Sequence, residues 1–405
     1  MKMNCAINKI IPLMNARLFC CAIAVVVLLG GISLKESDAG GKIIDQQTYR
    51  RITKQGTTAL DENKALPGYA LYSPVSSPGT VYLVDIKGEV VHQWNLPYPP
   101  GLYGYLLPNG NLFYMGKVHD ETWDIWPDWY AIKGGILMEV DWYGNVVWEY
   151  LDPYQHHDAR RTSTGGAIYL ATEQMPEDIA AVVKGGVADT GNDGMWADVI
   201  IEVDAAGNSI WEWHSYEHLD PGTDMIQPNC TRTEWGHANA VEPLDDDRVL
   251  VSFRNISVVG IVNKKSGDFE WRVGSTVLSQ QHDASMLQNG NILIFDNGEF
   301  RQNEHIPYSR VIEIKPETNE IVWDYEDSPE WNFFSPSVSG VQRLSNGNTL
   351  ITEGFYGRMF QVTPDGLVVW EYISPHFFQN PHGSFENIIF KALYYTEEYI
   401  STLLQ

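Results

Sequence analysis

The chain of 405 residues contains 44% hydrophobic and 20% charged residues, which is the balance of a folded globular protein with room for a large core. Its formal net charge of −25 opposes binding to phosphate backbones, so nucleic acid is excluded as a partner. The same charge favours solubility in an exported protein.

The first 39 residues have the pattern of an export signal. Three cations precede an apolar run at 18–32, and small residues at positions 37 and 39 form a cleavage site before Gly40. The run is shorter than the ~20 residues of a comfortable membrane span. We therefore expect residues 1–39 to be a signal peptide or an N-terminal membrane anchor, and the protein to be periplasmic or secreted.

The expected cleavage would also decide how many cysteines the mature protein keeps. Three of the four lie within the first 39 residues, so cleavage before Gly40 would leave Cys230 alone. No intramolecular disulfide could then form, and the core would have to stabilise the exported protein by itself.

Two sequence motifs alternate from about residue 82 onward. The first is a hairpin that ends in tryptophan, as in EVDWYGNVVWEY, and it occurs at 84–94, 139–150, 202–213, 261–271, 313–325 and 361–372. The second is an apolar strand after a turn, as in LQNGNILIF, and it occurs at 107–115, 162–171, 244–253, 287–295 and 344–352. Repeats of ~40–50 residues with about four short strands each are typical of β-propeller blades.

The count of expected inner strands and outer hairpins predicts how the ring closes. The first hairpin, at 84–94, has no inner strand before it, and the tail at 386–395 is a strand with no hairpin after it. We therefore predict an all-β fold, a six-bladed β-propeller closed by pairing of N- and C-terminal strands, which covers both free edges. It would occupy residues 81–405 and follow a lead-in segment at 40–80.

Aromatic residues occur in two settings along the repeats, the hairpins and the insertions. Tryptophans that recur at equivalent hairpin positions are expected to pack between blades, and these are Trp94, Trp148, Trp211, Trp271, Trp323 and Trp370. Two long insertions interrupt the blades, at 117–135 and 173–196. The first contains Trp123, Trp126, Trp129 and Tyr130, which either wall a ring-shaped substrate or pack over the rim.

Three histidines precede inner strands in consecutive blades. They lie in the segments HHDARR, WGHANAV and QQHDASM, and are His157, His237 and His282. Inner strands line the central channel of a propeller, so equivalent positions converge toward the axis. A series of three such histidines therefore indicates a site.

Further polar residues belong to this predicted site. Arg254 ends the strand that follows His237, and Asn239 comes two residues after that histidine. A guanidinium among neutral imidazoles favours a tetrahedral anion. Tyr103 and His382 occupy related positions in other blades and are weaker candidates for substrate binding.

These segments resemble the bacterial arylsulfate sulfotransferases, which work without a nucleotide sulfate donor. The resemblance runs from about residue 68 to residue 395 and is carried by HHDA, GHAN, VSFRN and QHDASMLQNGNILIFDNG. It implies a ping-pong transfer of a sulfuryl group from an aryl sulfate donor to a phenolic acceptor, with no cofactor. The sequence leaves open whether the chain pairs with itself.

The resemblance also implies roles for the site residues. His282 would be the nucleophile that forms a sulfohistidine, and Arg254, His237 and Asn239 would bind the sulfuryl oxygens. Either His157 or His237 would exchange the proton with the phenol.

Two other classes of function fit parts of the pattern. The first is a metal-dependent hydrolase with Zn²⁺ held by the three histidines, although Arg254 would repel a dication. Asp158 and Asp283 follow two of the histidines, and alternation along a strand predicts that they orient loops and bind no metal. The second is a non-catalytic secreted propeller that serves as a scaffold.

Overall fold

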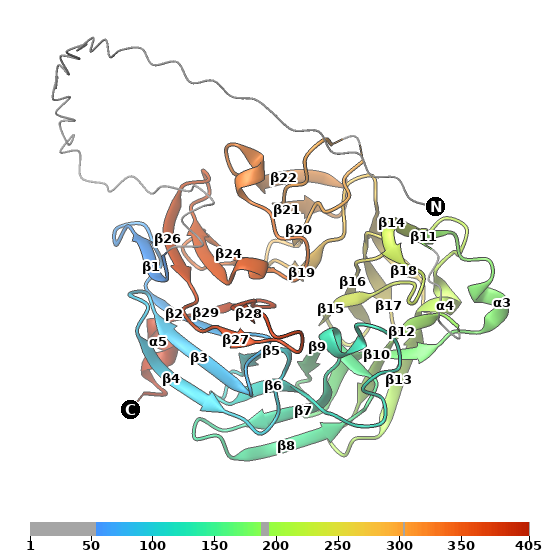
Figure 1. The fold of residues 1–405 in the computed structure, drawn as a ribbon, viewed down its shortest axis with the longest axis horizontal. Helices are drawn as coiled ribbons and strands as arrows, with labels where there is room; N and C mark the ends of the chain where they lie inside the picture. Colours follow the sequence, from blue (N-terminus) through green and yellow to red (C-terminus); the bar gives the residue numbers. More distant parts are fainter. Residues whose placement is uncertain (1–53, 188–193, 303, 405) are drawn as a thin grey trace, which may run out of the picture. The chain divides into compact units, whose positions relative to one another are not determined.

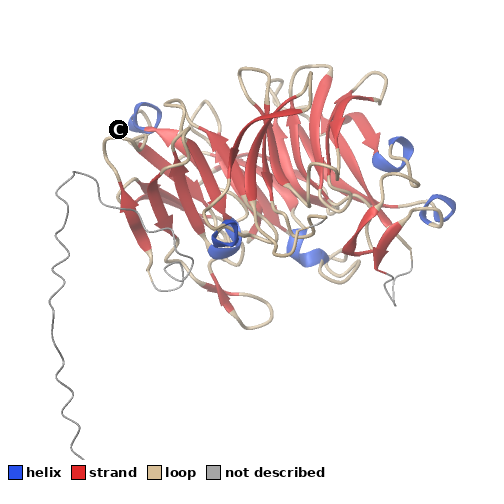
Figure 2. Ribbon diagram, turned by 90° about the horizontal axis from the view of Figure 1, so that it is seen from above, coloured by secondary structure: helices blue, strands red, loops and turns tan. Residues whose placement is uncertain are grey.

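The computed structural model describes residues 54–187, 194–302 and 304–404, so the segment expected to be an export signal lies outside the described residues. Within them, six antiparallel sheets surround a common axis (Figure 1), which confirms the predicted all-β, six-bladed β-propeller. Strands of neighbouring blades run side by side, and the short helices lie in the connecting loops (Figure 2). No helix in this part of the chain is long and apolar enough to cross a membrane.

Each blade is a meander whose innermost strand faces the axis. Blade 1 comprises β29 (Leu393–Thr396), β2 (Gly68–Tyr72), β3 (Thr80–Asp85) and β4 (Val90–Asn95). Blade 2 comprises β5 (Pro100–Leu106), β6 (Leu112–Lys117), β7 (Gly135–Val140) and β8 (Val146–Leu151). Blade 3 comprises β9 (Gln155–Arg161), β10 (Ala167–Gln174), β12 (Trp196–Val203) and β13 (Ser209–His214).

The other three blades follow in chain order. Blade 4 comprises β15 (Ala238–Pro243), β16 (Arg248–Phe253), β17 (Val258–Asn263) and β18 (Phe269–Val273). Blade 5 comprises β19 (His282–Met286), β20 (Ile292–Asp296), β21 (Arg310–Lys315) and β22 (Glu320–Tyr325). Blade 6 comprises β23 (Gly340–Arg343), β24 (Thr349–Glu353), β25 (Arg358–Val362), β26 (Val368–Ile373) and, at its outer edge, β1 (Gly56–Leu60).

Short elements complete the described chain. Two pairs of strands lie outside the blades, β11 (Gly185–Val187) with β14 (Ile226–Thr231) and β27 (Phe378–Gln379) with β28 (Phe385–Glu386). The helices are α2 (Trp129–Ile132), α3 (Glu177–Ala180), α4 (Ser215–His218), α5 (Glu397–Ser401) and the 3₁₀ turns η1 (Glu330–Asn332) and η2 (Gly354–Tyr356).

Blade 1 combines segments that are far apart in the sequence. β29 pairs antiparallel with β2, from Gly68 opposite Thr396 to Leu71 opposite Leu393. The segment before residue 81, expected only to lead into the propeller, thus contributes β2 here and β1 to blade 6. The strand predicted at 386–395 is shorter than expected, because regular pairing in the tail is limited to β29 and the two residues of β28.

The six repeated tryptophans form a continuous set of contacts between blades. Each indole Nε1 donates a hydrogen bond to the outer hairpin of the next blade, over distances of 2.7–3.3 Å, and the acceptors lie in Asp141, Ala205, Lys264, Asn319, Pro364 and Ile86 in turn. The last bond joins Trp370 of blade 6 to Ile86 of blade 1. The prediction that these residues pack between blades is confirmed.

Replacing Trp370 with alanine is expected to lower the free energy of unfolding by about 3–5 kcal/mol, because a fully buried indole leaves a cavity. Trp370 is 0% exposed, whereas Trp271 at the equivalent position of blade 4 is only partly buried. Urea denaturation of Trp370→Ala beside Trp271→Ala measures the difference. Equal losses in the two variants would contradict this account of the junction between blades 6 and 1.

Irregular backbone marks the inner strands at the end where the predicted site lies. β-Bulges interrupt the pairing of β5, β9, β15 and β19 with their neighbours. His157 and His237 have positive φ angles of 48° and 54°. Such left-handed backbone is uncommon for residues other than glycine, and with the bulges it redirects side chains away from regular alternation.

Candidate functional site

The four residues predicted to be catalytic line one cavity of about 470 Å³ near the axis. His157 lies in β9, His237 immediately precedes β15, Arg254 immediately follows β16, and His282 begins β19. Three consecutive blades therefore supply them, as the sequence predicts. The strands predicted to be innermost correspond instead to the second strands β10, β16 and β20, and the segments before them, which carry the histidines, form or lead into the innermost strands. Phe390 lies against two of the imidazoles, with ring centroids 6.0 Å from those of both His157 and His282.

The tautomer of His282 is set by Asn297, which follows β20. The Asn297 side-chain amide donates to the carbonyl oxygens of Ser335, at 2.8 Å, and Val338, at 3.1 Å. Its Oδ1 must then be the acceptor in the 2.8 Å contact with His282 Nδ1. The imidazole consequently carries its proton on Nδ1, and Nε2 keeps a free lone pair.

His282 is also held in its neutral form. Burial, and then the positive charge of Arg254, lower the pKa of this imidazole well below its usual value. The segment before it is fixed because the Ser279 backbone N–H donates to the buried carboxylate of Asp296 at 2.7 Å. The arrangement is that of an oriented neutral nucleophile.

His237 has a carboxylate partner that the sequence analysis did not identify. Its Nδ1 lies 2.5 Å from Glu234 Oε1, three residues earlier in the chain. Burial opposes ionisation of Glu234, but the interaction with His237 outweighs it and lowers the pKa of the carboxyl. A carboxylate in this position orients an imidazole that gives and takes protons through Nε2.

His157 lies against two other imidazoles, those of His237 and His156. Its ring centroid is 4.6 Å from that of His237, and its Nδ1 is 2.8 Å from Nδ1 of His156. Burial, with added repulsion from the neighbouring cationic forms, lowers the pKa of His157 well below its usual value. At neutral pH this residue is therefore uncharged.

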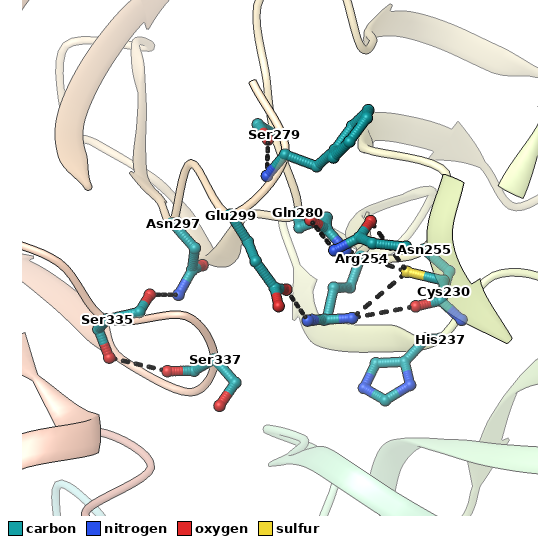
Figure 3. Close-up of polar contacts among 12 residues, drawn as sticks. Cys230, His237, Arg254, Asn255, Ser279, Gln280, Asn297, Glu299, Ser335 and Ser337 are labelled. Carbon is teal, nitrogen blue, oxygen red and sulfur yellow. Dashed lines mark hydrogen bonds and ion pairs between the residues drawn. The ribbon is translucent and has the colours of Figure 1, made fainter. Parts of the chain in front are cut away.

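Arg254 supplies the positive charge of the cavity. Figure 3 shows its guanidinium between Glu299 on one side and Cys230 with Asn255 on the other, near the ring of His237. Nη2 donates to Glu299 Oε2 at 2.6 Å, and Nη1 donates to Asn255 Oδ1 at 3.2 Å and to Cys230 Sγ at 3.7 Å. Glu299 is 31% exposed, so a ligand anion can displace it from the guanidinium into solvent.

A second and larger cavity adjoins the first. It measures about 740 Å³, and the two share Leu102, Ala131, Ser337 and Val338. The aromatic insertion covers both, because Trp126 borders the first cavity whereas Trp123 and Tyr130 border the second. The described residues of the second insertion, 173–187 and 194–196, border neither cavity, and Met175, Val183 and Met195 among them pack into the core of blades 3 and 4.

The three residues predicted to bind substrate are placed differently. His382 borders the second cavity, where its Nε2 lies 2.5 Å from the Tyr130 hydroxyl. Asn239 does not line either cavity, because it lies at the bulge of β15, is 0% exposed and donates to the Gln281 carbonyl at 2.8 Å. Tyr103 borders a separate cavity, where its hydroxyl binds Asp158.

Asp158 and Asp283 hold neighbouring inner strands together. Asp158 Oδ2 accepts from the backbone N–H of Val241 at 3.0 Å, and Asp283 Oδ2 accepts from that of Val341 at 2.8 Å. Both carboxylates thus orient the backbone of neighbouring inner strands, whereas the sequence analysis expected them to orient loops. Among the described residues no group of three or more His, Cys, Asp or Glu side chains is placed to hold a metal ion.

A neutral, oriented imidazole beside a guanidinium, near the axis of a six-bladed propeller, makes a site suited to binding an anionic group. Residues 133–375, more than half of the chain, match the family described as Arylsulfotransferase (ASST). The chain therefore belongs to the arylsulfotransferase family, as its resemblance to that family indicated.

Individual relatives are more distant. The chain is 22% identical over 313 residues to arylsulfate sulfotransferase AssT of Escherichia coli O6:H1 (strain CFT073), an alignment that covers 57% of this chain and 51% of that protein. The chain thus spans about half the length of this relative.

Solved structures share less with the chain. A protein of unknown function from Bacteroides caccae has 13% identity and a TM-score of 0.49, covering 82% of this chain and 100% of that one. A streptogramin B lyase has 12% identity and a TM-score of 0.43, covering 84% and 98%. Likenesses of this degree say nothing about function.

Proposed function

We propose that this protein transfers a sulfuryl group from an aryl sulfate to a phenol through a sulfohistidine on His282. The observation that carries the proposal is the contact of His282 Nδ1 with an asparagine oxygen whose orientation two backbone carbonyls determine. It leaves Nε2 unprotonated inside a cavity that also contains Arg254. Membership of the arylsulfotransferase family supports the same reaction.

In the first half-reaction, Nε2 of His282 attacks the sulfur atom of the donor. The Nε2–sulfur bond forms as the bond between sulfur and the aryl oxygen breaks, and the phenolate leaves with a proton taken from a neighbouring imidazole. The ring of the intermediate carries a positive charge. Asn297 Oδ1 stabilises it by accepting from Nδ1–H.

Arg254 binds the sulfuryl oxygens in this scheme. In the transition state of sulfuryl transfer the sulfuryl oxygens carry negative charge, so preorganised cations and hydrogen-bond donors lower the activation barrier. Glu299 occupies Nη2 in the structure described here, and the donor must take its place. His237, whose Nδ1 contacts Glu234, lines the same cavity, and its ring lies near the Arg254 guanidinium (Figure 3).

In the second half-reaction a phenol replaces the departed product. Its oxygen attacks sulfur, its proton goes to an imidazole, and His282 is released in its starting form. His157 and His237 both line the cavity and can exchange this proton. The second cavity, with Trp123 and Tyr130 on its wall, is suited to the aromatic ring of the acceptor.

The proposal is tested by supplying para-nitrophenyl sulfate with and without phenol. Transfer predicts release of nitrophenol that continues only when phenol is present, together with phenyl sulfate in equal amount. Release that is independent of phenol and yields inorganic sulfate would show a hydrolase instead. Absence of release with every phenol offered would overturn the proposal.

A further inference from the structure

Two buried ionisable residues lie behind His157 and do not line its cavity. His156 Nδ1 is 2.8 Å from His157 Nδ1, and His156 Nε2 is 3.5 Å from Asp198 Oδ1. Exposed fractions are 1% for His156, 2% for His157 and 3% for Asp198. A connected row therefore runs from the cavity into the protein, from His157 through His156 to Asp198.

The carboxyl at the inner end of this row is held in one orientation. Asp198 Oδ1 accepts from the Ala238 backbone N–H at 2.8 Å, while Oδ2 is buried without a hydrogen-bond partner. Oδ2 also lies so close to Gly236 that a Cβ there would collide with it. The atom that faces His156 is thus the one that Ala238 fixes in place.

Two protonation patterns fit the row once the 3.5 Å contact between His156 and Asp198 closes to hydrogen-bond length, and they differ at His157. If the carboxyl is protonated, it donates to Nε2 of His156, whose Nδ1–H donates to His157, so that Nε2 of His157 carries a hydrogen. If the carboxyl is ionised, its proton lies on Nε2 of His156 and the Nδ1 proton of His156 lies on Nδ1 of His157, so that each has moved one place toward the cavity and Nε2 of His157 presents a free lone pair. Neither pattern places a charge on an imidazole.

The row is poised between these patterns near neutral pH. Burial raises the pKa of Asp198 to about 8, with Glu234 and Glu173 adding to the effect, and burial lowers the pKa of His156 to about 4. The charged or titratable groups that act on His157 are His156, His237, His282 and Arg254. All of them disfavour an imidazolium at this position.

We propose that Asp198 and His156 are positioning residues that switch His157 between a proton donor and a proton acceptor. The proposal rests on the proposed sulfuryl transfer, because each half-reaction requires one of the two forms.

The protons balance over a full cycle. In the first half-reaction, His157 gives its Nε2 proton to the leaving phenolate, receives one on Nδ1 from His156, and His156 receives one on Nε2 from Asp198. Asp198 is then ionised. In the second half-reaction the acceptor phenol gives its proton to His157, and the two internal protons return to where they began.

Asp198→Asn tests the proposal with little change in shape. The Ala238 N–H still requires an acceptor, so the amide oxygen occupies the position of Oδ1 and can only accept from His156. His157 is then fixed as a proton acceptor. Donors whose leaving group needs a proton should therefore react more slowly in this variant, whereas donors that release a stable phenolate should be little affected.

The measured quantity is kcat/KM for the donor, which reports the first half-reaction of a ping-pong enzyme. We expect Asp198→Asn to lower it about 10²-fold more for phenyl sulfate than for para-nitrophenyl sulfate, whose phenolate is the more stable. Asp158→Asn is the matched control, since that buried carboxyl also accepts a neighbouring strand's N–H without contacting His156. Its effect should be equal for the two donors.

The outcomes are distinct. Equal losses for both donors in Asp198→Asn, or no loss for either, would overturn the proton row and leave the sulfuryl transfer standing. Failure of the wild type with both donors would overturn the proposed function and the row that depends on it.

Nitrogen NMR on protein labelled in its histidine rings tests the switch without substrate. In the wild type, His157 should change from the Nε2–H to the Nδ1–H tautomer as pH rises through about 8. Asp198→Asn should show Nδ1–H throughout, with His157→Gln used to assign the signals. One unchanging tautomer in the wild type would overturn the proposal.

Discussion

Replacing His282 with alanine is expected to abolish the proposed sulfuryl transfer, with a loss of at least about 10⁴-fold, because the variant has no atom that can form the proposed covalent intermediate. Folding should survive, since the lost side chain makes its hydrogen bond to Asn297 at the edge of a cavity and not within the packed sheets. The rate of transfer from para-nitrophenyl sulfate to phenol measures the effect. His305→Ala, at an exposed position, is the control and should keep full activity.

The pH dependence of the wild type belongs to the same prediction. Burial and Arg254 depress the pKa of His282, so its imidazole should stay neutral at pH values where an ordinary histidine is protonated. Transfer from para-nitrophenyl sulfate should therefore not fall as pH drops through about 6.5 on account of this group. Retention of near-normal activity in His282→Ala would refute its role as nucleophile.

Replacing Arg254 with glutamine is expected to lower kcat/KM for the donor by about 10²–10³-fold, since it removes the cation proposed to bind the sulfuryl oxygens. Glu299 would lose its partner, but at 31% exposure it remains hydrated, so stability should change little. Steady-state kinetics with a series of donor concentrations measure the loss.

Glu299→Gln is the counterpart of opposite sign. It removes the carboxylate that competes with the donor for Arg254 Nη2, so KM for the donor should fall or stay constant. A comparable loss of activity in both variants would contradict the assignment of Arg254 as the anion-binding group. It would indicate instead that the ion pair itself is needed to shape the cavity.

The sequence identifies the blades because their signals are local and repeated. Turn residues and a tryptophan recur in every outer hairpin, and the indole bonds to the next blade explain why that residue type is used. The sequence does not predict β2 in this way, because its residues GYALY lie between prolines and no repeated turn motif flanks them. Its pairing with β29 joins residues more than 300 positions apart, which no local pattern reports.

The site was predictable where it depends on the inner strands and not where it depends on bulges or loops. His237 and Asn239, two residues apart, should share a face of a regular strand, yet the bulge of β15 turns Asn239 into the sheet. Gly101–Tyr103 form a similar irregularity in β5, and Tyr103 faces a different cavity.

The partners of the histidines were missed for a related reason. Asn297 reads as the turn that stops β20, and Glu234 lies in a loop whose course only the three-dimensional structure gives. The one available signal was spacing, because Glu234 precedes His237 by three residues.

The measurement that tests the central claim most directly is intact-protein mass spectrometry after mixing with para-nitrophenyl sulfate and no acceptor. The account predicts that the wild type gains the mass of one sulfuryl group, that His282→Ala gains none, and that added phenol removes the group. A wild type that releases nitrophenol without gaining mass, or a gain that persists in His282→Ala, would contradict a sulfohistidine at this residue.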